Sequence, residues 1–335
     1  MTSSLYDLTG RKVLVTGGAG FIGSRTVEHL LHADAGEIVV VDDMVRGRAE
    51  NLAPALSTGR VRLVRGDICD RKLMASLVDG SDTVFHLAAL RITQCVVEPR
   101  RAIEVMVNGT YDILEQCVEA KVRKMVVASS ASIYGMASAF PTPEDHNPYA
   151  NRTLYGAAKS FAEGLLRAFN DTYGLDYVAL RYFNVYGPRM DIHGRYTEVL
   201  IRWMERLEAG LPPVVFGDGG QTMDMVHVED VARANVLAAR APATDVALNI
   251  GSGEETSLLQ LAELLAGEMS ASGLQPQHEA PRAVNPVPKR QADISAAAAQ
   301  IGYAPTLSLR EGLRDLVAWW RAEKLGAATA PGEAA

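Results

Sequence analysis

A glycine-rich turn between a buried strand and a helix is the feature that most constrains the fold of this chain. Residues 12–16 form a short apolar run typical of a buried parallel strand, and they lead directly into glycines at positions 17, 20 and 23. Glycines at this spacing allow a tight turn, close approach of a pyrophosphate to a helix N-terminus, and close packing of that helix on the strand. We therefore expect a dinucleotide to contact Gly17, Gly20, Phe21 and Ile22.

A second apolar run, residues 38–41, ends at Asp42 and Asp43. A carboxylate at this place can accept hydrogen bonds from both hydroxyls of an adenosine ribose, and it would repel a 2′-phosphate. The order of strand, glycine turn, helix, strand and aspartate therefore favours NAD over NADP as the cofactor, although Arg46 and Arg48 stand close by in the sequence.

Strands and helices continue to alternate after this unit. Apolar runs at 61–64, 83–87 and 125–128 predict further strands, and a helix is expected from about 99 to 120. The alternation predicts an α/β fold on a Rossmann-type, doubly wound parallel sheet with right-handed crossovers. Residues that follow these strands are expected to contact the cofactor, namely Asp67, Ile68, Leu87, Ala88 and Ala89.

Polar residues with acid–base potential come after the strand at 125–128. Ser129 and Ser130 lie at the edge where ligands of open α/β sheets bind. Tyr155 and Lys159 are four residues apart, so they share one face of a helix. A free tyrosine titrates near pH ~10, and a cation beside it in a desolvated cleft favours the phenolate. Unless the pair only decorates a helix surface, it predicts a phenolate base that acts on an alcohol.

Several motifs taken together resemble the extended short-chain dehydrogenase/reductase family. They are the glycine turn at 17–23, Asp67-Ile68, the segment 86–89, the serine segment 129–135, the Tyr155 and Lys159 pair, and the segments 181–189, 215–219 and 290–295. The resemblance covers nearly the whole chain. The joint presence of these motifs is typical of nucleotide-sugar enzymes.

The resemblance implies a Rossmann domain that holds NAD and a smaller C-terminal α/β domain that closes over a UDP-sugar. Residues 1–180 are expected to form the first domain, with 224–250 returning to it, and residues 181–223 and 251–325 the second. Residues 326–335 are expected to be a flexible tail. A homodimer is also implied, through a four-helix bundle built from the helices that carry Asn108 and Tyr155.

Residue roles follow from the same resemblance. Tyr155 would take the proton of the sugar 4′-hydroxyl, Ser130 would hydrogen-bond the same oxygen, and Lys159 would bind the nicotinamide ribose. Cofactor contacts are also expected from Tyr182, from Asn108 unless it is only a turn residue, and from Arg91, which can instead face the sugar or the surface. Expected substrate contacts are Ser130, Ser132, Asn184, Val199, Val215, Phe216 and Arg290, with Arg282 as an alternative phosphate ligand.

The two residues after Ser130 bear on the reaction that follows oxidation at C4. The resemblance implies Asp and Glu there in a dehydratase, and Glu at the second place in a uronate decarboxylase. This chain has Ala131 and Ser132, which cannot act as carboxyl acids or bases. Return of the hydride to the other face of the 4-keto sugar remains, which is a redox-neutral 4-epimerisation. A net oxidoreductase and a non-catalytic NAD-binding regulator are the alternatives from other classes.

Cationic residues follow Pro188, where the substrate loop of this family begins. Arg189, His193 and Arg195 are candidates for binding a C6 carboxylate, which gains from a charge-assisted contact, or they are loop charges. We therefore expect a UDP-glucuronate 4-epimerase that also forms UDP-galacturonate. The alternatives are a UDP-hexose or UDP-N-acetylhexosamine 4-epimerase and a UDP-glucuronate decarboxylase. Met223 stands where the family usually has a phosphate-binding arginine, so another arginine must compensate.

Composition argues against other classes of function. The net charge of −7 provides no basic footprint for nucleic acid. The three cysteines lack the spacing of metal ligands, so no metal site is expected, and they read as reduced thiols of a cytoplasmic protein. No apolar run approaches the roughly 20 residues needed to span a bilayer.

Overall fold

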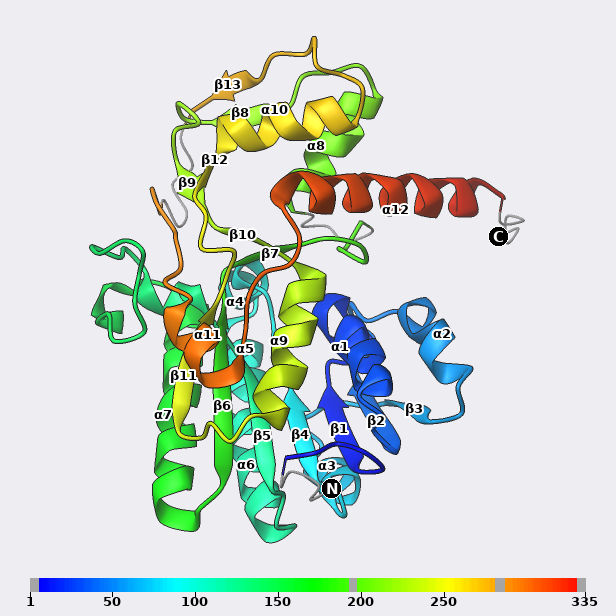
Figure 1. The fold of residues 1–335 in the computed structure, drawn as a ribbon, viewed down its shortest axis with the longest axis vertical. Coiled ribbons are helices and arrows are strands. Elements are labelled where there is room, and N and C mark those ends of the chain that lie inside the picture. The colour runs from blue at the N-terminus through cyan, green and yellow to red at the C-terminus, as the bar shows by residue number, and fades with distance from the viewer. Residues whose placement is uncertain (1–5, 193–197, 281–286, 330–335) are drawn as a thin grey trace.

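The computed structural model describes residues 6–192, 198–280 and 287–329. Its central feature is a sheet of seven parallel strands in the order β11-β6-β5-β4-β1-β2-β3 (Figure 1). The strands are β1 (Lys12–Thr16), β2 (Glu37–Asp42), β3 (Val61–Arg65), β4 (Thr83–His86), β5 (Lys124–Ser130), β6 (Asp176–Tyr182) and β11 (Val246–Ile250). The strand order reverses between β1 and β4, and ligands of doubly wound sheets bind outside the strand ends at such a point. The predicted Rossmann-type sheet is confirmed.

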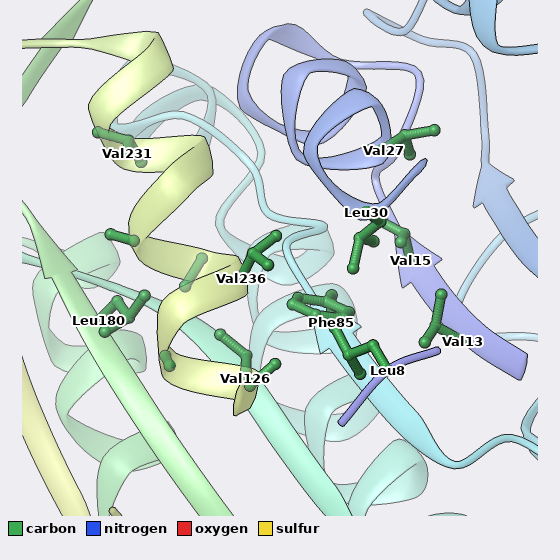
Figure 2. Close-up of a cluster of buried hydrophobic side chains, with 14 of the residues drawn as sticks. Leu8, Val13, Val15, Val27, Leu30, Phe85, Val126, Leu180, Val231 and Val236 are labelled. Carbon is green, nitrogen blue, oxygen red and sulfur yellow. The ribbon is translucent and has the colours of Figure 1, made fainter. Parts of the chain in front are cut away.

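Successive side chains of each strand feed two separate cores, because they point to opposite faces of the sheet. Val13 and Val15 of β1 face one core, and Leu14 faces the other. Figure 2 shows the first core, in which Val27 of one helix and Val236 of another pack above the strands. All-round burial explains why these strands read as continuous apolar runs rather than as alternating ones.

Helices cover both faces of the sheet (Figure 1). The first core is covered by α1 (Phe21–His32), α2 (Ala53–Leu56), α9 (Val228–Arg240) and α11 (Ser295–Ile301). The second is covered by α3 (Arg71–Val78), α4 (Ile92–Val97), α5 (Pro99–Ile103), α6 (Gly109–Glu119) and α7 (Leu154–Tyr173). The helix expected from about 99 to 120 is present, with a π-helical turn, η2 (Glu104–Asn108), between α5 and α6.

A third core lies beyond the carboxyl edge of the sheet. It is built by α8 (Val199–Glu208), α10 (Leu258–Glu268) and α12 (Leu309–Thr329) around the buried Trp203 and Trp320. Short strands border it, namely β7 (Asn184–Tyr186) with β10 (Met225–His227), β8 (Val214–Phe216) with β13 (Gln277–Glu279), and β9 (Thr222–Met223) with β12 (Thr256–Ser257). The tail was expected at residues 326–335, but α12 continues to Thr329, so residues 326–329 are helical. Residues 330–335 lie outside the described residues.

Three short 3-10 segments complete the described part of the chain, namely η1 (Ala49–Leu52), η3 (Ala131–Tyr134) and η4 (Pro148–Ala150). Ser130 is the N-cap of η3, and its Oγ accepts a hydrogen bond from the Ser132 backbone N–H at 3.1 Å. This contact fixes the turn directly after β5, so the serine segment leaves the sheet in one defined direction.

Candidate active site

A cavity of about 1080 Å³ lies at the carboxyl edge of the sheet, where the strand order reverses. One wall comes from the glycine turn after β1 and the segments after β2 to β5, and the other from residues 182–186, 189–192, 198–200 and 202, with Met223, Arg290 and Trp319. The two halves of the chain thus meet around one elongated space. Its size is in the upper range for cofactor and ligand sites.

Gly17 shows that the glycine turn is shaped for close backbone approach. Its φ is +68°, and a Cβ at this position would lie 2.9 Å from the Ala88 Cα and backbone N. Any side chain would therefore push the turn after β1 away from the end of β4. This backbone cradle at a helix N-terminus fits the pyrophosphate of a dinucleotide.

His86 holds the two central strand ends together beneath that cradle. Its Nδ1 lies 2.9 Å from Thr16 Oγ1, and its Nε2 lies 3.1 Å from Thr110 Oγ1. Thr16 Oγ1 also accepts hydrogen bonds from the backbone N–H groups of Leu87 and Ala88, both at 3.2 Å. Burial lowers the pKa of His86 to about 3, so the ring is neutral under ordinary conditions.

The acidic residues expected at the adenosine end, Asp42, Asp43 and Asp67, line the cavity, and all three already have backbone partners. Asp42 accepts hydrogen bonds from the N–H groups of Ala19 and Met44, at 3.0 and 2.9 Å. Burial raises the pKa of Asp42. Asp67 accepts a hydrogen bond from the Cys69 N–H at 2.9 Å and pairs with the Arg101 guanidinium. These carboxylates therefore also order the loops after β2 and β3, which the sequence did not indicate.

The structure brings Ser130, Tyr155 and Lys159 together in the wall of the cavity. Tyr155 and Lys159 stand on one face of α7, with Lys159 Nζ 5.8 Å from the centroid of the Tyr155 ring. The Tyr155 hydroxyl hydrogen-bonds the Ser130 side chain. Lys159 Nζ donates to the Ala128 carbonyl of β5 at 2.6 Å, which anchors the helix to the strand that carries Ser130.

Tyr155 has a higher pKa in this structure than the sequence led us to expect. Burial raises the pKa of Tyr155 to about 12, opposed by the Ser130 hydrogen bond and by Arg290 and Arg46. Burial also lowers the pKa of Lys159 itself to about 8. In the protein by itself, desolvation therefore outweighs the cations near Tyr155, because the same desolvation penalises both charges. That Lys159, together with the cationic nicotinamide ring, favours the phenolate stays a prediction.

Ion pairs link side chains of the cavity wall near Tyr155 and Lys159. Arg46 Nε lies 3.5 Å from Asp191 Oδ2, and Arg91 Nη1 lies 3.8 Å from the same oxygen. Arg91 Nη2 is also 3.5 Å from Glu198 Oε1. Arg91 is therefore a cavity residue and not an isolated surface charge. From the sequence, Arg46 bears only on the choice between NAD and NADP, and no motif indicates Asp191 or Glu198.

Several expected substrate contacts lie elsewhere. Val215 is fully buried in the third core, and Phe216 is not part of the cavity wall, so the expected contact with uracil has no support. Asn108, expected as a cofactor contact, lies in the π turn, where it is exposed and outside the wall. Arg189 reaches the wall, but its guanidinium binds Glu28, and Ser24 Oγ at 3.2 Å, so it is not available as a carboxylate ligand.

The other expected contacts line the cavity, namely Ser132, Tyr182, Asn184, Val199 and Arg290. The Asn184 amide donates to the Asp224 carbonyl at 3.0 Å. His193, Arg195 and the alternative Arg282 lie outside the described residues. Trp319 of α12 also lines the cavity, and no motif pointed to it.

Two absences hold for residues 6–192, 198–280 and 287–329. No cluster of three or more His, Cys, Asp or Glu side chains there is arranged to hold a metal ion. Over the same ranges, every helix is too short or too polar to cross a bilayer.

Comparisons with known proteins agree with this geometry. Residues 13–251 match the model of the NAD dependent epimerase/dehydratase family. A UDP-glucose 4-epimerase of Mycolicibacterium smegmatis is 37% identical over 313 residues, which cover 92% of this chain and 98% of that protein. The solved UDP-glucose 4-epimerase of Thermotoga maritima, with UDP-glucose, superposes with a TM-score of 0.86 at 35% identity over 93% of this chain and 99% of that one.

A second branch of the family is equally similar in structure. A double mutant of the dTDP-glucose 4,6-dehydratase of Streptomyces venezuelae, solved with NAD bound, has a TM-score of 0.86 and 30% identity, covering 94% of this chain and 98% of that one. The fold thus does not separate epimerases from dehydratases. The cavity, the glycine turn and these matches show that this chain belongs to the NAD-dependent epimerase/dehydratase family of extended short-chain dehydrogenases/reductases.

Proposed function

We propose that the protein is an NAD-dependent UDP-sugar 4-epimerase. The observation that carries the proposal is the grouping of Ser130, Tyr155 and Lys159 at the wall of the cavity that the glycine turn also lines. Tyr155 takes the proton of the sugar 4′-hydroxyl while Ser130 hydrogen-bonds the same oxygen. NAD, when bound, supplies the acceptor for the C4 hydride and its later return. Lys159 provides the cation beside Tyr155.

The residues after Ser130 favour epimerisation over dehydration. Ala131 and Ser132 are both buried in η3, so no carboxyl group follows Ser130 in this turn. A 4,6-elimination needs an acid for the departing C6 hydroxyl and a base for the C5 proton. Without this acid and base, the step that remains is rotation of the 4-keto sugar in the cavity, after which C4 takes the hydride back on its other face.

For the sugar, we propose UDP-glucuronate and UDP-galacturonate. Arg290 and Arg46 act electrostatically on the Tyr155 hydroxyl, where the sugar would react, and Arg91 lines the same cavity. Arg189 hydrogen-bonds Glu28 directly, whereas Arg91 lies 3.8 Å from Asp191 and 3.5 Å from Glu198. We therefore propose Arg91 for the C6 carboxylate and Arg290 for the diphosphate. UDP-glucose is the second candidate, favoured by the M. smegmatis and T. maritima relatives.

A uronate substrate adds a constraint, because its 4-keto form is a β-keto acid. Decarboxylation requires the breaking C–C bond to overlap the ketone π system. We propose that arginine contacts hold the carboxylate out of that geometry, and that the neutral Ser132 supplies no acid–base group to assist the loss of CO₂.

Product NMR with a panel of UDP-glucuronate, UDP-glucose and UDP-N-acetylglucosamine tests the proposal. We expect interconversion with the 4-epimer, no accumulation of NADH, and the highest kcat/KM for UDP-glucuronate. A UDP-pentose product would instead show a decarboxylase. Preference for UDP-glucose would leave the epimerase assignment standing and reject the uronate.

We further propose that the first half of the chain, with 224–250, binds NAD, that 181–223 and 251–325 bind the UDP-sugar, and that two copies pair through α4 to α7. Exposed apolar side chains gather on these helices, namely Val96, Val97, Ile103, Tyr111 and Phe161. Such a face is typical of an interface. Sedimentation should show a dimer, and the double variant Val97→Asp/Phe161→Asp should be monomeric.

A further inference from the structure

One buried ion pair lies directly behind the catalytic residues and has no part in the chemistry described above. Glu163 of α7 is 3% exposed, and its carboxylate is held by Arg181 of β6 through two hydrogen bonds, Nε–Oε1 at 2.9 Å and Nη2–Oε2 at 2.7 Å. Its Oε1 also accepts a hydrogen bond from Ser129 Oγ of β5. Ser129 and Arg181 are register partners in the sheet. One carboxylate therefore joins three elements.

Glu163 joins three elements that also carry residues of the cavity wall. It lies one turn beyond Lys159 and two turns beyond Tyr155, so all three residues share one face of α7. Ser129 directly precedes Ser130 at the end of β5, and Arg181 directly precedes Tyr182 of the cavity wall. Small movements of α7 relative to these strand ends would change the Tyr155 to Ser130 hydrogen bond.

Glu163 is also an electrostatic partner of Lys159. Burial lowers the pKa of Lys159 to about 8, and Cys95 and Glu163 oppose that shift. Burial raises the pKa of Cys95, so it is a neutral thiol near pH 7. The other titratable groups that face Lys159 or Glu163 are His86, Tyr134, Tyr155, Tyr177 and Arg181. Glu163 is thus the anion that favours a charged Lys159.

We propose that Glu163 is a positioning residue for the proposed epimerisation: it fixes α7 against the strand ends that carry Ser130 and Tyr182, and it keeps the buried Lys159 protonated. The inference rests on the proposed function. A purely structural ion pair would contribute to folding stability only, and its replacement by uncharged side chains is often neutral.

The experiment compares Glu163→Gln with the wild-type holoenzyme on whichever UDP-sugar the wild type converts. We expect kcat to fall about tenfold or more with a small change in KM, because ground-state binding is untouched. The alkaline limb of the kcat profile should move down by about one pH unit, because Lys159 then loses its proton at lower pH. Asp171→Asn removes an exposed carboxylate from the same helix and should change neither.

Glu163→Gln alone leaves Arg181 as a buried cation without its carboxylate partner. The double variant Glu163→Gln/Arg181→Gln removes that cation too, so it separates an effect on positioning from an effect on stability. We expect its melting temperature to recover towards that of the wild type while kcat and the alkaline limb stay altered. Recovery of kcat in the double variant, or an unchanged kcat and pH profile in Glu163→Gln, would reject the inference. A wild type that converts no UDP-sugar would reject the proposed function, and this inference with it.

Discussion

Tyr155 and Lys159 illustrate how the same burial acts in opposite directions on an acid and a base. Desolvation raises the pKa of Tyr155 to about 12 and lowers that of Lys159 to about 8, so burial shifts each group towards its uncharged form. Nearby cations therefore reduce the free energy needed to form the phenolate. Arg290 and Arg46 act in this direction, because each lowers the pKa of Tyr155. The positive charge of bound NAD acts in the same direction.

Tyr155→Phe should remove the proposed base while leaving the cavity intact. We expect kcat to fall by roughly a hundred- to ten-thousandfold, with NAD still bound to the purified protein. Steady-state turnover and the absorbance of released cofactor check this. Ser160→Ala, which removes another hydroxyl from α7, is the matched control and should retain activity.

His86 provides a prediction about stability. Its pKa is about 3 in the folded protein and about 6.5 in the unfolded chain. Below pH ~6.5 the unfolded chain binds a proton at His86 that the folded protein does not bind, so the free energy of unfolding falls as the pH drops towards 3. We expect His86→Asn to reduce this slope by up to about 1.4 kcal/mol per pH unit in urea unfolding between pH ~4.5 and ~6. The exposed His32→Asn should leave it unchanged.

At the scale of elements, the close packing of Gly156 in the first turn of α7 determines where the helix lies. A Cβ on Gly156 would lie 2.6 Å from the Ser132 carbonyl oxygen and 2.4 Å from Asn151 Oδ1. The helix therefore lies directly against η3, the turn that follows Ser130. This close packing, together with Glu163, sets the height of Tyr155 above the end of the sheet.

Two alanine substitutions on this one helix should have opposite effects. Gly156→Ala should destabilise the protein by about 1–3 kcal/mol and lower kcat, because the backbone next to Tyr155 must move. Gly164→Ala meets nothing closer than 3.9 Å and should stabilise it by about 0.5–1 kcal/mol without a change in kcat. Thermal unfolding and turnover of both variants check this, and equal effects would contradict it.

The elements themselves were largely predictable, since buried parallel strands, the glycine turn and the Tyr155 to Lys159 spacing are local patterns. Contacts that depend on tertiary packing were not. Nothing in the sequence near Arg189 shows that its guanidinium turns back to Glu28 of α1. Val215 has the same apolar character in a core as in a binding site, so its burial could not be read from its residue type.

At the scale of the whole molecule, the cavity depends on both halves of the chain. Arg290 comes from the far end of the sequence, lines the cavity and acts on Tyr155. Met223, which replaces the arginine usual for the family, lines the same cavity and cannot pair with a phosphate. We therefore propose two tasks for Arg290, one at the diphosphate and one beside Tyr155.

Arg290→Gln should reveal both tasks. We expect KM for the UDP-sugar to rise about tenfold or more, because a charge-assisted contact is lost. Removing the cation raises the pKa of Tyr155, so the acid limb of the kcat profile should move up by as much as about one pH unit. A pH series of turnover measurements checks this, and Lys289→Gln, which loses an ion pair to Glu255, serves as the control.

The sheet is completed late in the chain, and this has a consequence for how the protein is made. β6 ends at Tyr182, but its outer neighbour β11 begins only at Val246. During synthesis the ribosome must deliver the whole intervening segment before this edge can be sealed, and an open edge invites pairing with other chains. A nascent chain halted between these strands is therefore the species most in need of chaperone protection.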